Sequence, residues 1–315
     1  MKHLPAVLRG VLLAVVLAGA RTAPCAARDL TFFHVSDTHY GQSGPGDLAM
    51  AALVDAMNAL PGTAYPTNLG GVVARPRGVI HTGDVTNDGR EEPWAAFVRD
   101  FGLLGGDGRL AWPVFETFGN HDGGSNRPVR IAIRDRNPRR RDVTSISSNG
   151  LHYAWTWEGI RFICCGISPG TRAKTYDPED SLAFLSAELA RLDRAGAPVV
   201  LLHHFGFDEG HSLRWWPEAW RTDLRSTIAG RNVIAILHGH AHHPLIYRWA
   251  GIDVYHPPHF RQKAPAETGA VSHGFFVFRI TDVELTVAER RLDGTWGMTA
   301  RKPVGNAPPV RGTEE

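Results

Sequence analysis

The sequence predicts a single α/β domain in which mixed β-sheets are covered by helices. Three observations lead to this fold class. Strand-like and helix-like runs alternate through most of the chain, strand pairs occur in its middle and at its end, and no linker or internal repeat divides it. A length of 315 residues suits two domains or one large one, and the absence of a linker favours one. The composition, 43% hydrophobic and 21% charged, excludes a disordered or collagen-like chain.

The first half of the domain is expected to alternate strands with two helices. Apolar residues from Leu48 to Met57 recur at helical spacing and predict a helix over 47–60. A second helix is expected over 92–104, with Pro93 in its first turn, where a missing backbone N–H is tolerated. Short apolar runs rich in β-branched and aromatic residues predict strands at 30–35, 78–81 and 114–118.

The second half is expected to contain strand pairs as well as helices. The dipeptide Glu158-Gly159 separates two apolar runs and predicts a hairpin. A helix is expected to begin at Asp177, with Pro178 just inside it, and to end before Gly196. Another helix is expected over 216–228. The strands are predicted at 151–157, 161–167, 199–202, 233–237, 245–249, 252–255, 275–280 and 283–287.

The N-terminus has the features of a processing signal. A basic start precedes an apolar run over 11–20, which is shorter than the ~20 residues that a membrane-spanning helix needs. We therefore expect residues 1–27 to be a signal peptide, no stable membrane span, and export to the periplasm or the exterior. An uncleaved N-terminal anchor is the alternative. The single domain would occupy 28–300, and the residues at 301–315, with several prolines, would form a poorly ordered tail.

Charge and cysteine content exclude further classes. The formal net charge is +2, so the chain is not a general polyanion binder and no nucleic-acid partner is expected. Three cysteines are too few for a disulfide-built scaffold. Cys164 and Cys165 are adjacent on a predicted strand and would point to opposite faces, which indicates two small buried hydrophobes rather than a bridge.

The informative polar residues stand directly after predicted strands. Because ligands bind at the carboxyl ends of strands in open α/β sheets, we expect these endings to converge on one crevice. Carboxylates, imidazoles and one amide oxygen suit ions such as Mn, Fe or Zn, and no thiolate is present to indicate a structural zinc site. Gly83, Gly119 and Gly239 stand beside them, where a sharp turn must follow a strand. The five blocks are Asp37-Thr38-His39, Gly83-Asp84, Gly119-Asn120-His121-Asp122, His203-His204 and Gly239-His240-Ala241-His242.

In this order the blocks resemble the signature of the calcineurin-like metallophosphoesterase superfamily, which is D-x-H, GD, GNH followed by an acid, a lone H, and GHxH. The resemblance covers roughly residues 30 to 245. It implies two packed mixed β-sheets flanked by helices, an αββα sandwich. It also implies two divalent or trivalent metal ions, of which Mn, Fe and Zn are candidates.

The resemblance further implies which residues hold these ions. Asp84 would bridge them together with a hydroxide. The first ion would be held by Asp37, His39, Asp84 and His242. The second would be held by Asp84, Asn120, His203 and His240. Phe205 stands where the superfamily usually has proline, and His203 rather than His204 is expected to be the ligand.

Other residues near the motifs are candidates for catalysis or substrate binding. The resemblance implies that His121 protonates the leaving oxygen and that Asp122 orients its ring. His204 is a candidate substrate group. Arg127 and Arg130 begin an arginine-rich segment that either collects an anionic phosphate substrate or is a solvated insertion.

Aromatic and histidine residues beyond the motifs leave two interpretations open. Trp215, Trp216 and Trp220 would wall the substrate pocket or simply pack in the core. His256 and His259 lie after a strand and would reach the crevice or remain apart from it.

The resulting functional hypothesis is a secreted phosphoesterase with two metal ions. It would hydrolyse small-molecule or lipid-headgroup phosphate esters, preferentially phosphodiesters, by means of the metal-bridged hydroxide. A phosphomonoesterase, a lipid-directed phosphoesterase and a non-catalytic binding protein on the same fold are the alternatives.

Overall fold

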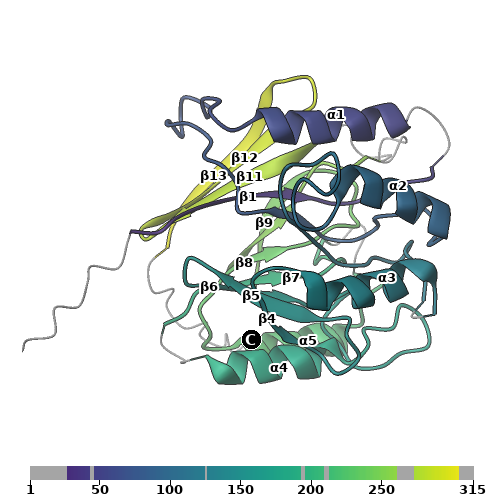
Figure 1. The fold of residues 1–315 in the computed structure, drawn as a ribbon. Helices are drawn as coiled ribbons and strands as arrows, with labels where there is room; N and C mark the ends of the chain where they lie inside the picture. Colours follow the sequence, from purple (N-terminus) through teal and green to yellow (C-terminus); the bar gives the residue numbers. More distant parts are fainter. Residues whose placement is uncertain are drawn as a thin grey trace, which may run out of the picture.

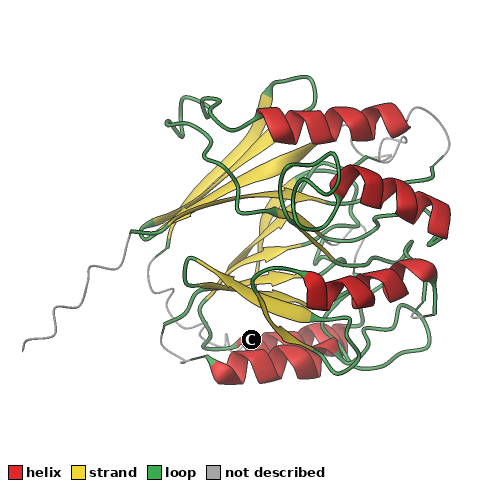
Figure 2. Cartoon of the chain, viewed as in Figure 1, coloured by secondary structure: helices red, strands yellow, loops and turns green. Residues whose placement is uncertain are grey.

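Two β-sheets pack face to face, and helices cover their outer faces (Figures 1 and 2). This arrangement confirms the predicted fold class. The predicted signal peptide falls outside the described residues except for its last position, and the end of the predicted tail also falls outside them. The computed structural model describes residues 27–42, 46–124, 126–192, 196–208, 213–260 and 273–304.

The first sheet consists of β1 (Asp29–Val35), β2 (Val79–His81), β3 (Val114–Glu116), β11 (Gly274–Thr281), β12 (Glu284–Arg291) and β13 (Trp296–Pro303). Its strand order is β13-β12-β11-β1-β2-β3. β1, β2 and β3 run parallel to one another. On the other side of β1, the neighbouring pairs β1–β11, β11–β12 and β12–β13 are antiparallel. The carboxyl ends of β1, β2 and β3 therefore meet at one edge.

The second sheet consists of β4 (Val143–Ile146), β5 (Tyr153–Trp157), β6 (Ile160–Cys164), β7 (Val199–Leu202), β8 (Val233–Leu237), β9 (Leu245–Trp249) and β10 (Ile252–His256). Its strand order is β4-β5-β6-β7-β8-β10-β9, with β6, β7, β8 and β10 parallel. The predicted hairpin is confirmed, since β5 and β6 are joined at Glu158 and Gly159, which both have positive φ.

The helices are α1 (Gly46–Ala59), α2 (Glu91–Phe101), α3 (Pro128–Arg136), a short 3₁₀ helix η1 (Asn137–Arg139), α4 (Ser181–Arg191) and α5 (Glu218–Ile228). α1 and α2 lie over the first sheet, and α4 and α5 lie over the second (Figure 1). Met50, Leu53 and Met57 are buried on one side of α1, as their helical spacing predicts. Within the described residues, no helix has the length and apolarity to cross a membrane.

Aromatic side chains fill the layer between the two sheets. Phe32 of β1 stacks on Phe278 of β11 with ring centroids 4.8 Å apart, and Trp155 of β5 is fully buried in the same cluster. Cys164 belongs to this inter-sheet cluster, whereas Cys165 belongs to the cluster covered by helices. Both thiols are free, which confirms that the adjacent cysteines are buried hydrophobes on opposite faces of the sheet.

The predicted helix from Asp177 begins later and ends earlier than expected. Oδ1 of Asp177 accepts a hydrogen bond from the N–H of Glu179 at 2.9 Å, so this side chain closes a turn instead of capping a helix. Asp180 then has a left-handed backbone, and α4 starts only at Ser181. Its end at Arg191 lies well before Gly196.

The sequence patterns did not predict α3, β4 or β13. β4 is short and only partly buried, and the exposure of β13 is typical of a sheet edge, so neither has a strong apolar run. β13 extends to Pro303, so the regular structure reaches beyond residue 300, where the tail was expected to begin.

Two arginines of the arginine-rich segment are structural, whereas Arg127, Arg134, Arg139 and Arg141 are exposed. Arg136 and Arg140 turn inward, and their guanidinium groups lie 2.9 and 2.6 Å from Oε1 of the fully buried Glu116 on β3. The same two side chains also donate to the backbone carbonyls of Gly102 and Val114. Burial would raise the pKa of Glu116, but the two cations hold it below its ordinary value.

We expect Glu116→Gln to lower the free energy of unfolding by about 3–5 kcal/mol, because it leaves two buried guanidinium groups without a counter-charge. Denaturant unfolding would measure the change. The control is Glu92→Gln, since Glu92 is exposed and lies 3.9 Å from Arg90; its loss should change stability by less than about 1 kcal/mol. A Glu116→Gln protein as stable as the control would contradict this assignment.

Candidate metal centre

The loops that leave the carboxyl ends of the parallel strands converge at one end of the two sheets. Asp37 and His39 follow β1, Asp84 follows β2, and Asn120 follows β3. From the second sheet, the loop after β7 contributes a histidine and the loop after β8 contributes two more. The five sequence blocks therefore meet, as predicted from their positions after strands.

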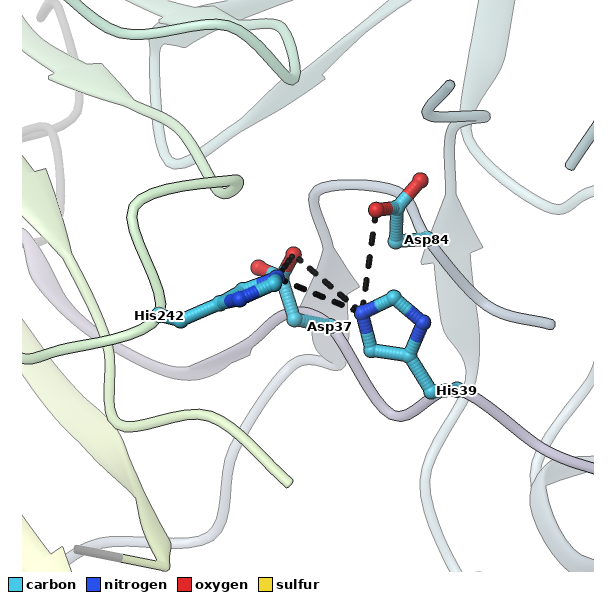
Figure 3. Close-up of side chains that lie close together, drawn as sticks. All are labelled: Asp37, His39, Asp84 and His242. Carbon is cyan, nitrogen blue, oxygen red and sulfur yellow. Dashed lines mark hydrogen bonds and ion pairs between the residues drawn. The ribbon is translucent and has the colours of Figure 1, made fainter. Parts of the chain in front are cut away.

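The first residue group consists of Asp37, His39, Asp84 and His242, whose ligand atoms all lie within 4.8 Å of one another (Figure 3). Nε2 of His39 lies 3.3 Å from Nε2 of His242 and 3.7 Å from Oδ2 of Asp84. Nε2 of His242 is 3.3 Å from Oδ1 of Asp37. All four residues are buried, so their donor atoms point at a common small space rather than at solvent.

The second residue group consists of Asp84, His204 and His240. Nε2 of His204 lies 3.4 Å from Oδ2 of Asp84 and 3.1 Å from Oδ1 of Asn120. Nδ1 of His204 donates to the carbonyl oxygen of Thr82 at 2.9 Å, which turns Nε2 toward the group. The amide oxygen of Asn120 thus completes a set of nitrogen and oxygen donors around Asp84.

Asp84 belongs to both groups, and its two oxygens differ. Oδ1 accepts a hydrogen bond from the backbone N–H of His121 at 2.8 Å. Oδ2 is buried and accepts no hydrogen bond from the described residues, yet imidazole nitrogens from both groups face it. A buried carboxylate oxygen in this position suits an ion on either side. The residues present therefore fit two metal ions that share one anionic ligand.

The electrostatics of the group match this interpretation. Burial would raise the pKa of Asp84, but the imidazoles of His204 and His39 hold it below its ordinary value. Burial opposes a charge on His204, but the Asp84 carboxylate raises the pKa of His204 to about 9. Burial lowers the pKa of His39 to about 3. A metal ion at His204 would therefore displace a proton on binding.

Several residues of this centre have strained backbones. Asp37, His39, Asp84, His240 and His242 all have φ between 46° and 76°, in the left-handed region that residues other than glycine seldom adopt. Each such residue costs about 1–3 kcal/mol unless the surroundings compensate. Concentration of this conformation in five neighbouring polar residues indicates a site whose geometry serves function rather than stability.

Two of the motif glycines are required by close approach rather than by their φ. A Cβ on Gly119 would collide with the Asp84 side chain and would lie 2.7 Å from Nε2 of His204. A Cβ on Gly239 would collide with Ser36 and lie 2.7 Å from Oδ2 of Asp37. Only Gly83 of the three has a positive φ, at 97°, so the predicted sharp turn applies to that position alone.

The prediction that His203 belongs to this centre is wrong in the structure, where His204 takes its place. His203 is buried between Phe207 and Trp216, and its Nδ1 donates to the carbonyl of Phe205 at 2.6 Å. The physical reason is strand alternation. Along β7 the even-numbered side chains face the inter-sheet layer and the odd-numbered ones face the helices, so His204 points toward the centre and His203 away from it.

The two histidines can be separated experimentally. We expect His204→Ala to lose metal from the second group and to lower the activity sharply, whereas His203→Ala should keep its full metal content. Metal content per chain, measured by elemental analysis, decides between them. Retention of both metals by His204→Ala together with their loss from His203→Ala would restore the first prediction.

The ring of His121 is held by a backbone carbonyl and not by Asp122. Nδ1 of His121 donates to the carbonyl oxygen of Asn87 at 2.8 Å, so that carbonyl orients the ring. The carboxylate of Asp122 forms no hydrogen bond with the ring. This carboxylate accepts hydrogen bonds from the N–H groups of Val85, Thr86 and Gly119, and so ties the loop after β2 to the loop after β3. The prediction that Asp122 orients His121 is therefore wrong.

The end of β10 and the segment after it also reach the centre, a contribution left open by the sequence. His256 accepts a hydrogen bond at Nε2 from the N–H of Ala241 at 3.1 Å, within the Gly239–His242 loop. The ring of His259 stacks on that of His242 with centroids 5.4 Å apart. Both histidines are buried. Their position at the end of a parallel strand, with His256 as its last residue and His259 just beyond it, is the sequence signal that indicates them.

Two cavities open beside the residue groups. The first cavity, of about 210 Å³, is lined by Asn120, His121, Tyr176, Arg214, Trp215, His240 and His242. The second, of about 380 Å³, has among its walls Asn120, Asn126, Arg130, Lys174, Tyr176, Asp177 and Glu179.

The predicted substrate residues fall in different places. Arg130 lines the second cavity, whereas Arg127 is exposed and lines neither. Trp215 lines the first cavity, while Trp216 is fully buried and Trp220 packs beside Gly170.

Comparison with known proteins identifies the family. Residues 30–244 match the family model of the calcineurin-like phosphoesterases. The chain belongs to this family. This calcineurin-like phosphoesterase is accordingly a metal-dependent hydrolase of phosphate esters. The matched range agrees with the resemblance, and its histidine and aspartate groups could hold the metals on which the family depends.

Individual relatives of this calcineurin-like phosphoesterase differ in what their names describe. A probable cyclic nucleotide phosphodiesterase of Rhodococcus erythropolis is 26% identical over 227 residues, which cover 70% of this chain and 67% of the relative. A dimetal phosphatase from Danio rerio has a TM-score of 0.57 at 14% identity, over 88% of this chain and 99% of its own. GAP50, the anchor in the inner membrane complex of Plasmodium, has a TM-score of 0.60 at 14% identity, over 88% and 89%. The two structures establish the fold alone, because one fold hosts different functions.

Proposed function

We propose that this phosphoesterase hydrolyses phosphodiesters. The observation that carries the proposal is the pair of cavities beside the residue groups, which share Asn120 and Tyr176 as walls. A phosphodiester carries two substituents on phosphorus and needs a space for each, whereas a monoester needs one. The name of the Rhodococcus erythropolis relative supports the same choice.

Two metal ions are assigned to the two residue groups, with Mn, Fe and Zn as the candidates that suit these donors. When bound, the ions would polarise the phosphate oxygens and lower the pKa of the attacking water. Asp84 is the proposed shared ligand. The first ion is assigned to Asp37, His39, Asp84 and His242, and the second to Asp84, Asn120, His204 and His240.

His121 is the proposed acid that protonates the leaving oxygen. It lines the first cavity, next to Asn120, and its ring is 4.8 Å from that of His39. Because a carbonyl oxygen can only accept, the hydrogen bond to Asn87 keeps a proton on Nδ1. As an imidazolium, the ring would then deliver its Nε2 proton to the leaving oxygen and become neutral, with the Nδ1 proton kept.

Arg130 is the proposed cationic wall of the second cavity. Its side chain is almost fully buried, and its guanidinium group lies over the ring of Phe118 at 4.1 Å and 3.8 Å from the carboxylate of Glu179. Nε of Arg130 is buried and has no hydrogen-bond partner among the described residues. With Asp177 and Glu179, it gives this cavity the polar character that suits a hydroxylated substituent of the ester.

A substrate panel tests the proposed function. The protein, stripped of metal by chelation and then reconstituted with Mn, Fe or Zn, would be assayed on bis-p-nitrophenyl phosphate and p-nitrophenyl phosphate. These esters share a leaving group and differ in the second substituent. Cyclic nucleotides and glycerophosphodiesters complete the panel. We expect the diester to have the higher kcat/KM and no turnover without metal; a monoester hydrolysed about tenfold faster than the diester would refute the diester preference.

Export is a separate proposal, supported by the sequence of residues 1–27 alone. We expect protein recovered outside the cytoplasmic membrane to begin between residues 21 and 28, as N-terminal sequencing would show. Intact Met1 on that protein would refute cleavage and leave the phosphoesterase assignment unaffected.

A further inference from the structure

The first cavity has an aromatic and cationic wall that neither the metal ions nor the phosphate explains. Trp215 and Tyr176 line it, with their ring centroids 5.3 Å apart and their planes perpendicular. The indole of Trp215 also meets the ring of His240, in the second residue group, at 6.1 Å. This aromatic pair thus lies directly beside the place where the ester would react.

Tyr176 is held in place by more than its contact with Trp215. Its backbone is left-handed, with φ of 51°, and its ring meets that of buried Phe205 edge to face at 5.7 Å. A strained residue in a loop persists only where the surrounding structure holds it, and such residues cluster at ligand sites. Tyr176 also lines both the first and the second cavity.

Arg214 supplies a positive charge to the same wall. Its guanidinium group lies over the indole of Trp215 at 4.8 Å. Within the described part of the chain, no carboxylate pairs with it, although most other arginines of the domain have such a partner. A planar guanidinium stacked on an indole presents a flat cationic surface, which suits an electron-rich heteroaromatic ring.

We propose that Arg214, Trp215 and Tyr176 form a subsite that binds a planar heteroaromatic substituent of the phosphodiester, of the nucleobase type. The phosphate would lie at Asn120 and His121, and the ring would lie against the Trp215 wall. The subsite sets substrate choice and takes no part in bond cleavage. It rests on the proposed phosphodiesterase function and adds to it the chemical class of one substituent.

Paired ligands that differ only in the base test this subsite. AMP and ribose 5-phosphate share the phosphate and the sugar, so the ratio of their dissociation constants isolates the contribution of adenine. The measurement is calorimetric binding to the Mn-reconstituted protein. We expect AMP to bind about tenfold more tightly, within the range for stacking of one base on an aromatic side chain, and the binding of both to be abolished by chelation.

Variants then locate the contribution. Trp215→Ala and Arg214→Ala should each reduce the AMP to ribose 5-phosphate ratio toward one without weakening ribose 5-phosphate, and Trp215→Phe should retain part of it. Trp220→Ala and Arg225→Ala serve as controls for the loss of a tryptophan or an arginine outside the cavity, and should leave the ratio unchanged. Thermal unfolding of each variant separates a local effect from misfolding.

The possible failures are distinguishable. If both ligands bind only with metal but equally tightly, or if Trp215→Ala weakens both alike, the aromatic subsite is wrong and the phosphodiesterase function stands. If neither ligand binds in a metal-dependent way and no diester is hydrolysed, the proposed function fails and the subsite fails with it.

Discussion

Asp84→Asn is expected to remove both metal ions and to lower kcat/KM by at least about a thousandfold, because bound metal supplies several kcal/mol of transition-state stabilisation. Asp84 is the one residue shared by both groups, and imidazole nitrogens from each lie 3.4 and 3.7 Å from its Oδ2. The substitution keeps the size of the side chain and an oxygen that can accept from the N–H of His121, but it removes the charge. The fold should therefore survive the loss of metal.

The measurement is elemental analysis of the purified variant, together with turnover of bis-p-nitrophenyl phosphate. Asp88→Asn is the matched control, since Asp88 lies four residues further on, is exposed and pairs with Arg90 at 2.5 Å. It should retain metal and activity. Two metal ions still bound to Asp84→Asn would rule out the shared-ligand assignment.

His121→Ala is expected to slow the hydrolysis of alkyl esters by about 10²–10⁴-fold and that of nitrophenyl esters much less. A nitrophenolate is stable as an anion and leaves without help, whereas an alkoxide of ribose or glycerol needs a proton in the transition state. His121 faces the first cavity with Nδ1 held by the carbonyl of Asn87, so its Nε2 is positioned to supply that proton.

Comparison of the two leaving groups with one variant provides the control, because the protein and its metal content are then common to both measurements. His240→Ala should instead slow both esters, since its ring belongs to the second residue group. Equal slowing of both esters by His121→Ala at full metal content would show that His121 positions the phosphate rather than acting as an acid.

The site residues that directly follow strands could be predicted, because their side-chain types and their positions after strands can be recognised from short stretches of sequence. Asp37, His39 and Asp84 are polar residues placed immediately after apolar runs, and parallel strands deliver such endings to one edge of a sheet. The same reasoning places His240 and His242 at the carboxyl edge of the second sheet, after β8. The packing of the two sheets then decides that the two edges meet at one centre.

The choice between His203 and His204 required that packing. Alternation along β7 predicts only that the two rings point to opposite faces of the sheet. Which face the helices cover decides that His204, and not His203, points toward the metal centre. The arginine-rich segment shows the same limit. Composition indicates a charged surface, but Arg136 and Arg140 are drawn inward by the buried carboxylate of Glu116, which lies on β3 twenty residues before Arg136.

Most strands and helices, the chemistry of the metal ligands and the family could be derived from the sequence, because each depends on neighbouring residues or on motif order; α3, β4 and β13 could not. The place of His204 in the second residue group, the carbonyl that orients His121, and the aromatic wall at Trp215 depend on contacts between segments far apart in sequence. Such contacts are selected by the packing of two sheets and their helices as a whole. Only the folded chain therefore shows which polar residues face the reacting ester and which face the core.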